Sequence, residues 1–129
     1  MPNFLRWDSE KRRLYEHVTG TWTIEDARAY SAQARPVLRR ALQSAGPITF
    51  LSDFTDLKVV SSDVAELLDP IVEMQRKLPI ERYAAVTSSA LLRMQIRRMM
   101  GSFPCTFFDN KNDAMDWLGW PPEYLAEKP

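Results

Sequence analysis

The sequence predicts an α/β domain: a four- or five-stranded, mostly parallel sheet with an N-terminal hairpin and about four helices. Two observations carry this prediction. Short apolar runs with the composition of buried strands alternate with longer segments whose apolar residues recur at helical spacing. Glycine or proline punctuates most of the boundaries between them. Because strands that alternate with helices are joined by right-handed crossovers, this order implies a parallel sheet covered by helices.

The N-terminal segment predicts a β-hairpin. Two strand-like runs, Asn3–Trp7 and Arg13–Val18, flank the turn-forming residues 8–10. Gly20 ends the second run. The one histidine of the chain, His17, falls in this hairpin, and we expect it at the surface or at a sheet edge.

A long helix is expected next, over about Ile24–Ser44. Thr23 can accept a hydrogen bond from the amide three residues on, and Asp26 lies in the first turn, where negative charge is favourable. Pro36 falls on the side opposite to the apolar stripe. We therefore expect one kinked helix rather than two, ended by Gly46-Pro47.

Three further apolar runs predict parallel strands at Pro47–Leu51, Arg82–Thr87 and Cys105–Phe108. Between the first two, a helical face runs from Val64 to Leu78. Pro70 lies off this face, which predicts either a kink or a short separate turn at the helix start.

Two shorter helices complete the pattern. One is expected over Leu91–Met100, capped by a serine that precedes it and closed by Gly101. The other is expected to be capped by Asp109 or Asn110, with Gly119 past its end. These segments give the order β-β-α-β-α-β-α-β-α.

We expect residues 1–129 to form a single domain whose last ten residues, 120–129, are a proline-rich tail. Trp120, Tyr124 and Leu125 lie in this tail, and we expect them to fold back over an apolar surface of the same subunit or of a neighbour.

Composition excludes several classes of function. The formal net charge is zero, so no overall field attracts nucleic acid. A single cysteine and a single histidine leave no disulfide and few zinc or Ser-His-Asp arrangements. No apolar run has the length of a signal peptide core or a transmembrane helix. We expect a bacterial cytoplasmic protein.

The stretch LSDFTDLKVVSSDVAELL resembles the central element of anti-sigma-factor-antagonist (STAS) domains. Those domains carry an apolar strand, an aspartate, a small polar linker and a serine or threonine at a helix start. Here Asp53 ends the strand, and Ser62 stands at the family's phosphoacceptor position. The segments RYAAVTSSALLRMQIRRMM and FFDNKNDAMDWLGW are similar to SpoIIAA-like proteins, which are related in shape to CRAL-TRIO lipid-binding domains. The resemblance covers about residues 10–119 and implies a STAS fold.

Ser61 and Ser62 admit two interpretations, a helix cap or a phosphoacceptor. A capping hydroxyl accepts a hydrogen bond from an otherwise unpaired helix amide, which contributes about 1 kcal/mol. A phosphate on Ser62 would lie at the positive end of the helix dipole. Ordinary antagonists have an aspartate where this chain has Ser61, and Asp63-Val64 stands where they have Ser-Gly. Capping is therefore the favoured hypothesis.

A second candidate site lies on the segment SSALLRMQIRRMMG. Leu92, Ile96 and Met99 form its inward stripe, which leaves a methionine among arginines on the outer face. That composition fits a solvated basic face, a homodimer or partner contact, or an anion site with backbone donors at the helix start. The candidate interface or anion-binding residues are Arg93, Met94, Arg97, Arg98, Ser88 and Ser89.

The sequence contains no catalytic motif. Asp53, Asp56 and Asp63 follow a parallel strand, where α/β sites usually lie. No EF-hand spacing, phosphate-binding glycine loop or nucleophile elbow accompanies them, so we expect no catalytic residue, metal or cofactor. We expect a non-enzymatic cytoplasmic regulatory or protein-interaction module. The alternative is a domain that binds or senses a lipid or small apolar anionic ligand in a pocket lined by aromatic residues.

Overall fold

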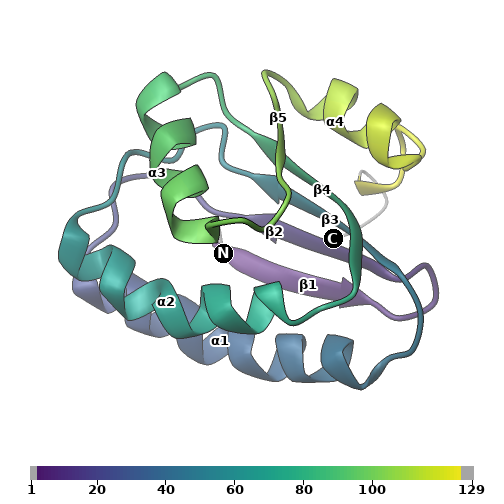
Figure 1. Cartoon of the computed structure of the whole chain (residues 1–129). Helices are drawn as coiled ribbons and strands as arrows, with labels where there is room; N and C mark the ends of the chain where they lie inside the picture. The colour runs from purple at the N-terminus through teal and green to yellow at the C-terminus, as the bar shows by residue number, and fades with distance from the viewer. Residues whose placement is uncertain (1–2, 126–129) are drawn as a thin grey trace.

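The computed structural model describes residues 3–125, and its elements follow the predicted order (Figure 1). Five strands form one sheet in the order β1-β2-β3-β4-β5. Strand β1 is antiparallel to β2, and the other neighbouring pairs are parallel. The predicted hairpin and mostly parallel sheet are therefore confirmed. The strands are β1 (Phe4–Asp8), β2 (Arg13–His17), β3 (Ile48–Asp53), β4 (Ile80–Val86) and β5 (Thr106–Phe108).

Four helices connect or follow these strands. They are α1 (Ile24–Gln43), α2 (Ser62–Arg76), α3 (Ala90–Met100) and α4 (Lys111–Leu118). A capping box between Thr23 and Asp26 begins α1, as the sequence indicates. Helix α1 continues across Pro36 and α2 across Pro70, so neither proline splits its helix. Within residues 3–125, no helix is both long and apolar enough to cross a membrane.

The sheet separates two apolar clusters. Because side chains alternate along a strand, Leu14 and Phe50 lie on one face and Tyr15 and Leu51 on the other. Helices α1, α2 and α3 contribute to the first cluster, and α4 to the second. Figure 1 shows α1 and α2 side by side, away from α4. The pocket described below lies on the side of the first cluster.

The segment after α4 folds back onto the second cluster, as predicted. Trp120 and Tyr124 are buried there with their rings 5.4 Å apart. Trp120 Nε1 donates a hydrogen bond of 2.8 Å to Thr49 Oγ1, and the Tyr124 hydroxyl donates to Asp8. Residues 126–129 of the predicted tail lie outside the described residues.

Candidate ligand-binding site

Three neighbouring strands place polar side chains in the core between the sheet and α1 and α2. They are Glu16 on β2, Ser52 on β3 and Tyr83 on β4, and each is at most 5% exposed. The parallel register aligns Glu16 with Ser52. Because strand residues of one parity share a face, Glu16 points inward together with Leu14. An acid is therefore held where the strand pattern calls for an apolar residue.

Hydrogen bonds link these groups into one cluster. Ser52 Oγ donates to Glu16 Oε1 at 2.6 Å, and the hydroxyl of Tyr30 on α1 donates to Glu16 Oε2. The hydroxyl oxygens of Ser52 and Tyr83 are 2.9 Å apart. Since the Ser52 proton goes to Glu16, Tyr83 is the donor of that pair. The carboxyl group is thus the common acceptor of hydrogen bonds from the sheet and α1.

Burial governs the protonation of this cluster. It raises the pKa of Glu16, while hydrogen bonds from Ser52, Tyr30 and Gln75 favour the ionised form and oppose the shift. Burial also raises the pKa values of Tyr30 and Tyr83 well above their ordinary range. Among the groups that shift the pKa of Glu16, none is cationic.

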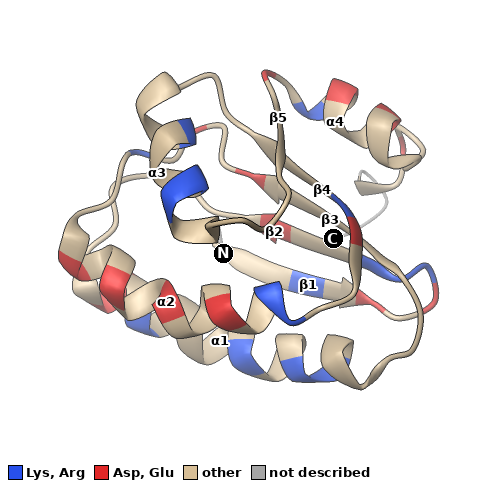
Figure 2. Ribbon diagram, in the orientation of Figure 1, with Lys and Arg blue, Asp and Glu red and all other residues tan. Residues whose placement is uncertain are grey.

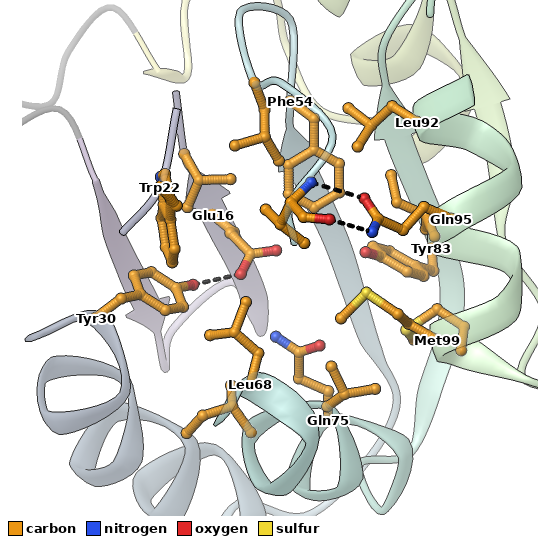
Figure 3. A pocket seen from close by; sticks show the side chains of 17 residues that line it. Glu16, Trp22, Tyr30, Phe54, Leu68, Gln75, Tyr83, Leu92, Gln95 and Met99 are labelled. Atoms are coloured by element: carbon orange, nitrogen blue, oxygen red, sulfur yellow. Dashed lines mark hydrogen bonds between the residues drawn. The ribbon is translucent and has the colours of Figure 1, made fainter. Parts of the chain in front are cut away.

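A cavity of about 80 Å³ lies beside the cluster (Figure 3). Its lining comes from the sheet, α1, α2, α3 and the segment 54–60, and is mostly apolar. Of the described residues that line it, Glu16 is the only aspartate, glutamate, lysine, arginine or histidine. Figure 3 shows the Gln75 amide and the Tyr83 hydroxyl directed toward Glu16. Four aromatic side chains belong to the wall: Trp22, Tyr30, Phe54 and Tyr83.

A glutamine joins two walls of this pocket. Gln95 on α3 accepts a hydrogen bond of 3.0 Å from the Val60 amide and donates one of 2.8 Å to the Val60 carbonyl. Both residues line the cavity. The paired bonds fix the segment that precedes α2 against α3, so the pocket is in direct contact with the entry to α2.

The structure places the two serines of the STAS-like segment at that entry. Ser61 is the N-cap of α2, and its hydroxyl accepts a hydrogen bond of 3.2 Å from the Val64 amide. Ser62 is the first helical residue and is exposed. Phosphorylation of Ser62 stays the alternative hypothesis, which the intact mass of protein from its native host tests.

The outer face of α3 is only partly free. Arg93 donates two hydrogen bonds to the Thr87 carbonyl, at 3.0 and 2.8 Å, and pairs with Asp109 at 2.6 Å. Arg97 lies over the Phe107 ring, 4.8 Å from its centroid. Both arginines therefore have roles within the domain. Leu91 and Met94, by contrast, are 68% and 58% exposed. Arg98 is also exposed.

The six residues proposed for anion binding do not meet at one point. Ser88 precedes α3, Ser89 is its N-cap, and Arg97 and Arg98 lie in its last turn. Arg97 is eight positions after Ser89, which is about 12 Å along a helix. The Arg93 side chain reaches back to the start of the helix, but its guanidinium is already paired there with Asp109.

The three aspartates at the end of β3 and beyond it do not cluster either. Asp53 is buried, and its Oδ1 accepts hydrogen bonds from the Thr55 amide and hydroxyl. Its Oδ2 lies 3.9 Å from His17 Nε2 and 3.8 Å from Lys111 Nζ. Asp56 and Asp63 are exposed. Throughout the described residues, no three histidine, cysteine or acidic side chains are grouped to hold a metal ion. His17 lies on the interior strand β2 with its side chain 32% exposed, so of the two predicted positions it is at the surface rather than at a sheet edge.

Sequence reasoning did not single out Glu16, Ser52 or Gln75, although their positions carried a signal. Glu16 has the same strand parity as Leu14 and Val18, which predicts an inward carboxylate. Gln75 stands in the apolar stripe of its helix. Polar residues on two apolar faces that pack together indicate a buried polar cluster.

The architecture, with its strand, aspartate, linker and serine-capped helix, is that of a STAS domain. A family model described as SpoIIAA-like matches residues 13–119, so the chain belongs to the SpoIIAA-like family. The family and fold inferred from the resemblance are thereby confirmed, and a regulatory module of STAS type is supported in general terms. No curated protein and no solved structure matches the chain.

Proposed function

We propose that the chain is a non-enzymatic, cytoplasmic regulatory module that acts by binding a protein, and that this protein is a second copy of itself. The observation that carries the proposal is the exposed apolar surface of α3. Leu91 and Met94 are one helical turn apart and more than half exposed. Because methionine and arginine are enriched in interface cores, this face is better suited to a protein than to solvent.

The Gln95–Val60 bonds extend this surface to the STAS-like segment. They hold Val60 against α3, and its neighbour Val59 is 48% exposed. Ser62, at the family's phosphoacceptor position, follows two residues after Val60. A partner that covers α3 would therefore lie beside Ser62, where a change of charge affects binding.

Charge complementarity favours a second copy. Glu66 and Asp69 are exposed on α2, and Arg97 and Arg98 are exposed on α3 (Figure 2). In a two-fold symmetric pair, the acidic side of one α2 can face the basic side of the other α3. Each subunit then supplies both halves of the contact, which agrees with a net charge of zero.

Sedimentation velocity over a range of concentrations tests this dimer. We expect Met94→Glu to shift the wild-type dimer to monomer, because it places a charge in the apolar contact. Leu42→Glu is the matched control, since Leu42 is an exposed leucine on α1. A wild-type chain that stays monomeric, or a Met94→Glu variant that stays dimeric, contradicts the proposal.

A second candidate function is the binding of a small, mainly apolar ligand. The cavity beside Glu16 supports it, because it combines aromatic walls with a few converging polar groups. Its volume of about 80 Å³ limits the ligand. A dry cavity of about 150 Å³ binds benzene. The pocket therefore suits a small molecule or the end of a chain rather than a whole lipid.

Native mass spectrometry of gently purified protein tests for such a ligand. We expect a retained mass in the wild type and its loss in Leu68→Trp, which fills the pocket from its wall. Leu67→Trp is the control, because Leu67 is adjacent to Leu68 in the sequence but does not line the cavity. If both variants retain the same ligand mass, the ligand binds outside this pocket.

A further inference from the structure

We propose that the pocket takes a small organic cation, an alkylammonium whose charge pairs with Glu16. This inference rests on the ligand-binding function proposed for the pocket and specifies the chemistry of the ligand's polar end. Two independent features support it. One is a buried carboxyl group whose hydrogen-bonding neighbours among residues 3–125 are neutral, and the other is the aromatic wall.

The neighbours of Glu16 donate hydrogen bonds but carry no positive charge. Tyr30 faces it from α1, Gln75 from α2 and Ser52 from β3. Behind Ser52 lies Tyr83 of β4, whose hydroxyl oxygen is 2.9 Å from Ser52 Oγ. A carboxylate removed from water is costly unless a counter-charge accompanies it. A cationic ligand would supply the charge that these neighbours lack.

The aromatic wall selects for the same class of ligand. The faces of aromatic rings attract organic cations, and proteins use such rings to bind alkylated ammonium groups. Trp22 and Tyr30 stand with ring centroids 5.3 Å apart on one side of the cavity, and Tyr83 and Phe54 also line it. The carboxylate of Glu16, which lines the cavity, repels an anionic ligand. The small apolar anion, which the sequence left open as an alternative ligand, is therefore disfavoured in this pocket.

The pairing makes a prediction about pH. An ammonium ligand needs ionised Glu16, and burial raises the pKa of this group. Affinity should therefore rise as the pH climbs through that pKa, and fall again only when the amine loses its own proton. No other charged group among the described lining residues competes for the ligand.

Three probes of equal chain length separate charge from shape: n-butylammonium, 1-butanol and butyrate. Each is titrated into the full chain and followed by the amide NMR shifts of pocket residues. We expect n-butylammonium to bind about tenfold more tightly than 1-butanol, and butyrate to bind most weakly. In Glu16→Gln, which keeps the shape and a hydrogen-bond acceptor, the preference for ammonium should vanish. Glu81→Gln, at an exposed position of β4 that does not line the cavity, should preserve it.

The outcomes distinguish the two levels of the proposal. If none of the probes shifts pocket residues, the ligand-binding function fails and the cation assignment fails with it. If 1-butanol or butyrate binds as tightly as n-butylammonium, the pocket stands and the assignment to Glu16 is overturned. Should Glu16→Gln not fold, the wild-type ranking and its pH dependence decide. An ammonium affinity that does not rise with pH also overturns the assignment.

Discussion

Ser52 donates a hydrogen bond of 2.6 Å to Glu16 across the β2–β3 pair, where the parallel register aligns the two residues. The same hydroxyl oxygen accepts from Tyr83 on β4. One small side chain therefore connects polar groups on three strands. Parallel strands that are buried on both faces usually carry apolar residues at such inward positions, so the polar connection is a departure from the usual strand pattern.

Replacing Ser52 by alanine should destabilise the domain. The change removes the Ser52 donor from Glu16 and leaves the buried Tyr83 hydroxyl without its acceptor. An unsatisfied buried polar group costs about 1–3 kcal/mol in the free energy of unfolding. Urea denaturation of Ser52→Ala measures this loss. The control is Ser102→Ala, at an exposed position, which should change stability by less than about 0.5 kcal/mol. If both substitutions lowered the free energy of unfolding by the same amount, the hydrogen-bonded cluster around Glu16 would have no special role in stability.

Glu16 should make the ligand-free domain less stable as the pH rises. Burial raises its pKa in the folded state above the value in the unfolded chain. The folded state then holds the proton more tightly, so the contribution to stability is complete below the unfolded pKa. It is lost as the pH rises through the folded pKa. Thermal unfolding measured at several pH values should show this loss of stability in the wild type but not in Glu16→Gln. Parallel plots of melting temperature against pH for the two proteins would refute the prediction.

The two serines at the start of α2 should differ in their effect on stability. Ser61→Ala removes the cap on the Val64 amide and should cost about 1 kcal/mol. Ser62→Ala removes an exposed hydroxyl from the first helical turn and should change stability by less than about 0.5 kcal/mol. Chemical denaturation compares the two directly. A larger loss for Ser62→Ala would indicate that its hydroxyl has a structural contact.

The sequence predicted the order of elements because each carries a local signal. The Thr23 capping segment and Gly119 mark where helices begin and end, and both predictions agree with the structure. Boundaries differed where the local signal was weak. The strand predicted over Pro47–Leu51 extends to Asp53, since pairing with β2 and β4 continues through two polar residues. Tertiary hydrogen bonding, which no local pattern reports, sets that end.

The candidate site was harder to predict because it depends on contacts between distant elements. Thirty-six residues separate Glu16 from Ser52, and only the strand register brings them together. Arg93 gives the opposite lesson. Its helical position predicted an outward basic group, whereas its long side chain folds back to Thr87 and Asp109. Helical periodicity fixes where a side chain starts, but not where its charged end lies.

Cys105 should be a poor nucleophile in the folded protein. Burial raises the pKa of its thiol to about 12, although nearby Arg97 favours the thiolate. At pH 8 about one molecule in ten thousand would then carry the thiolate, against roughly a quarter of unfolded chains. Alkylation by iodoacetamide should therefore be at least about a hundredfold slower in the native state than in urea. Mass spectrometry of timed samples measures both rates.

A variant separates burial from the influence of the neighbouring cation. Arg97→Ala removes the charge that stabilises the Cys105 thiolate, so alkylation of the native protein should slow further. Arg98→Ala is the control, because Arg98 is not among the groups that shift the thiol pKa. Faster alkylation in Arg97→Ala would mean that Arg97, which covers the Phe107 ring, limits access to the thiol more than it stabilises its charge.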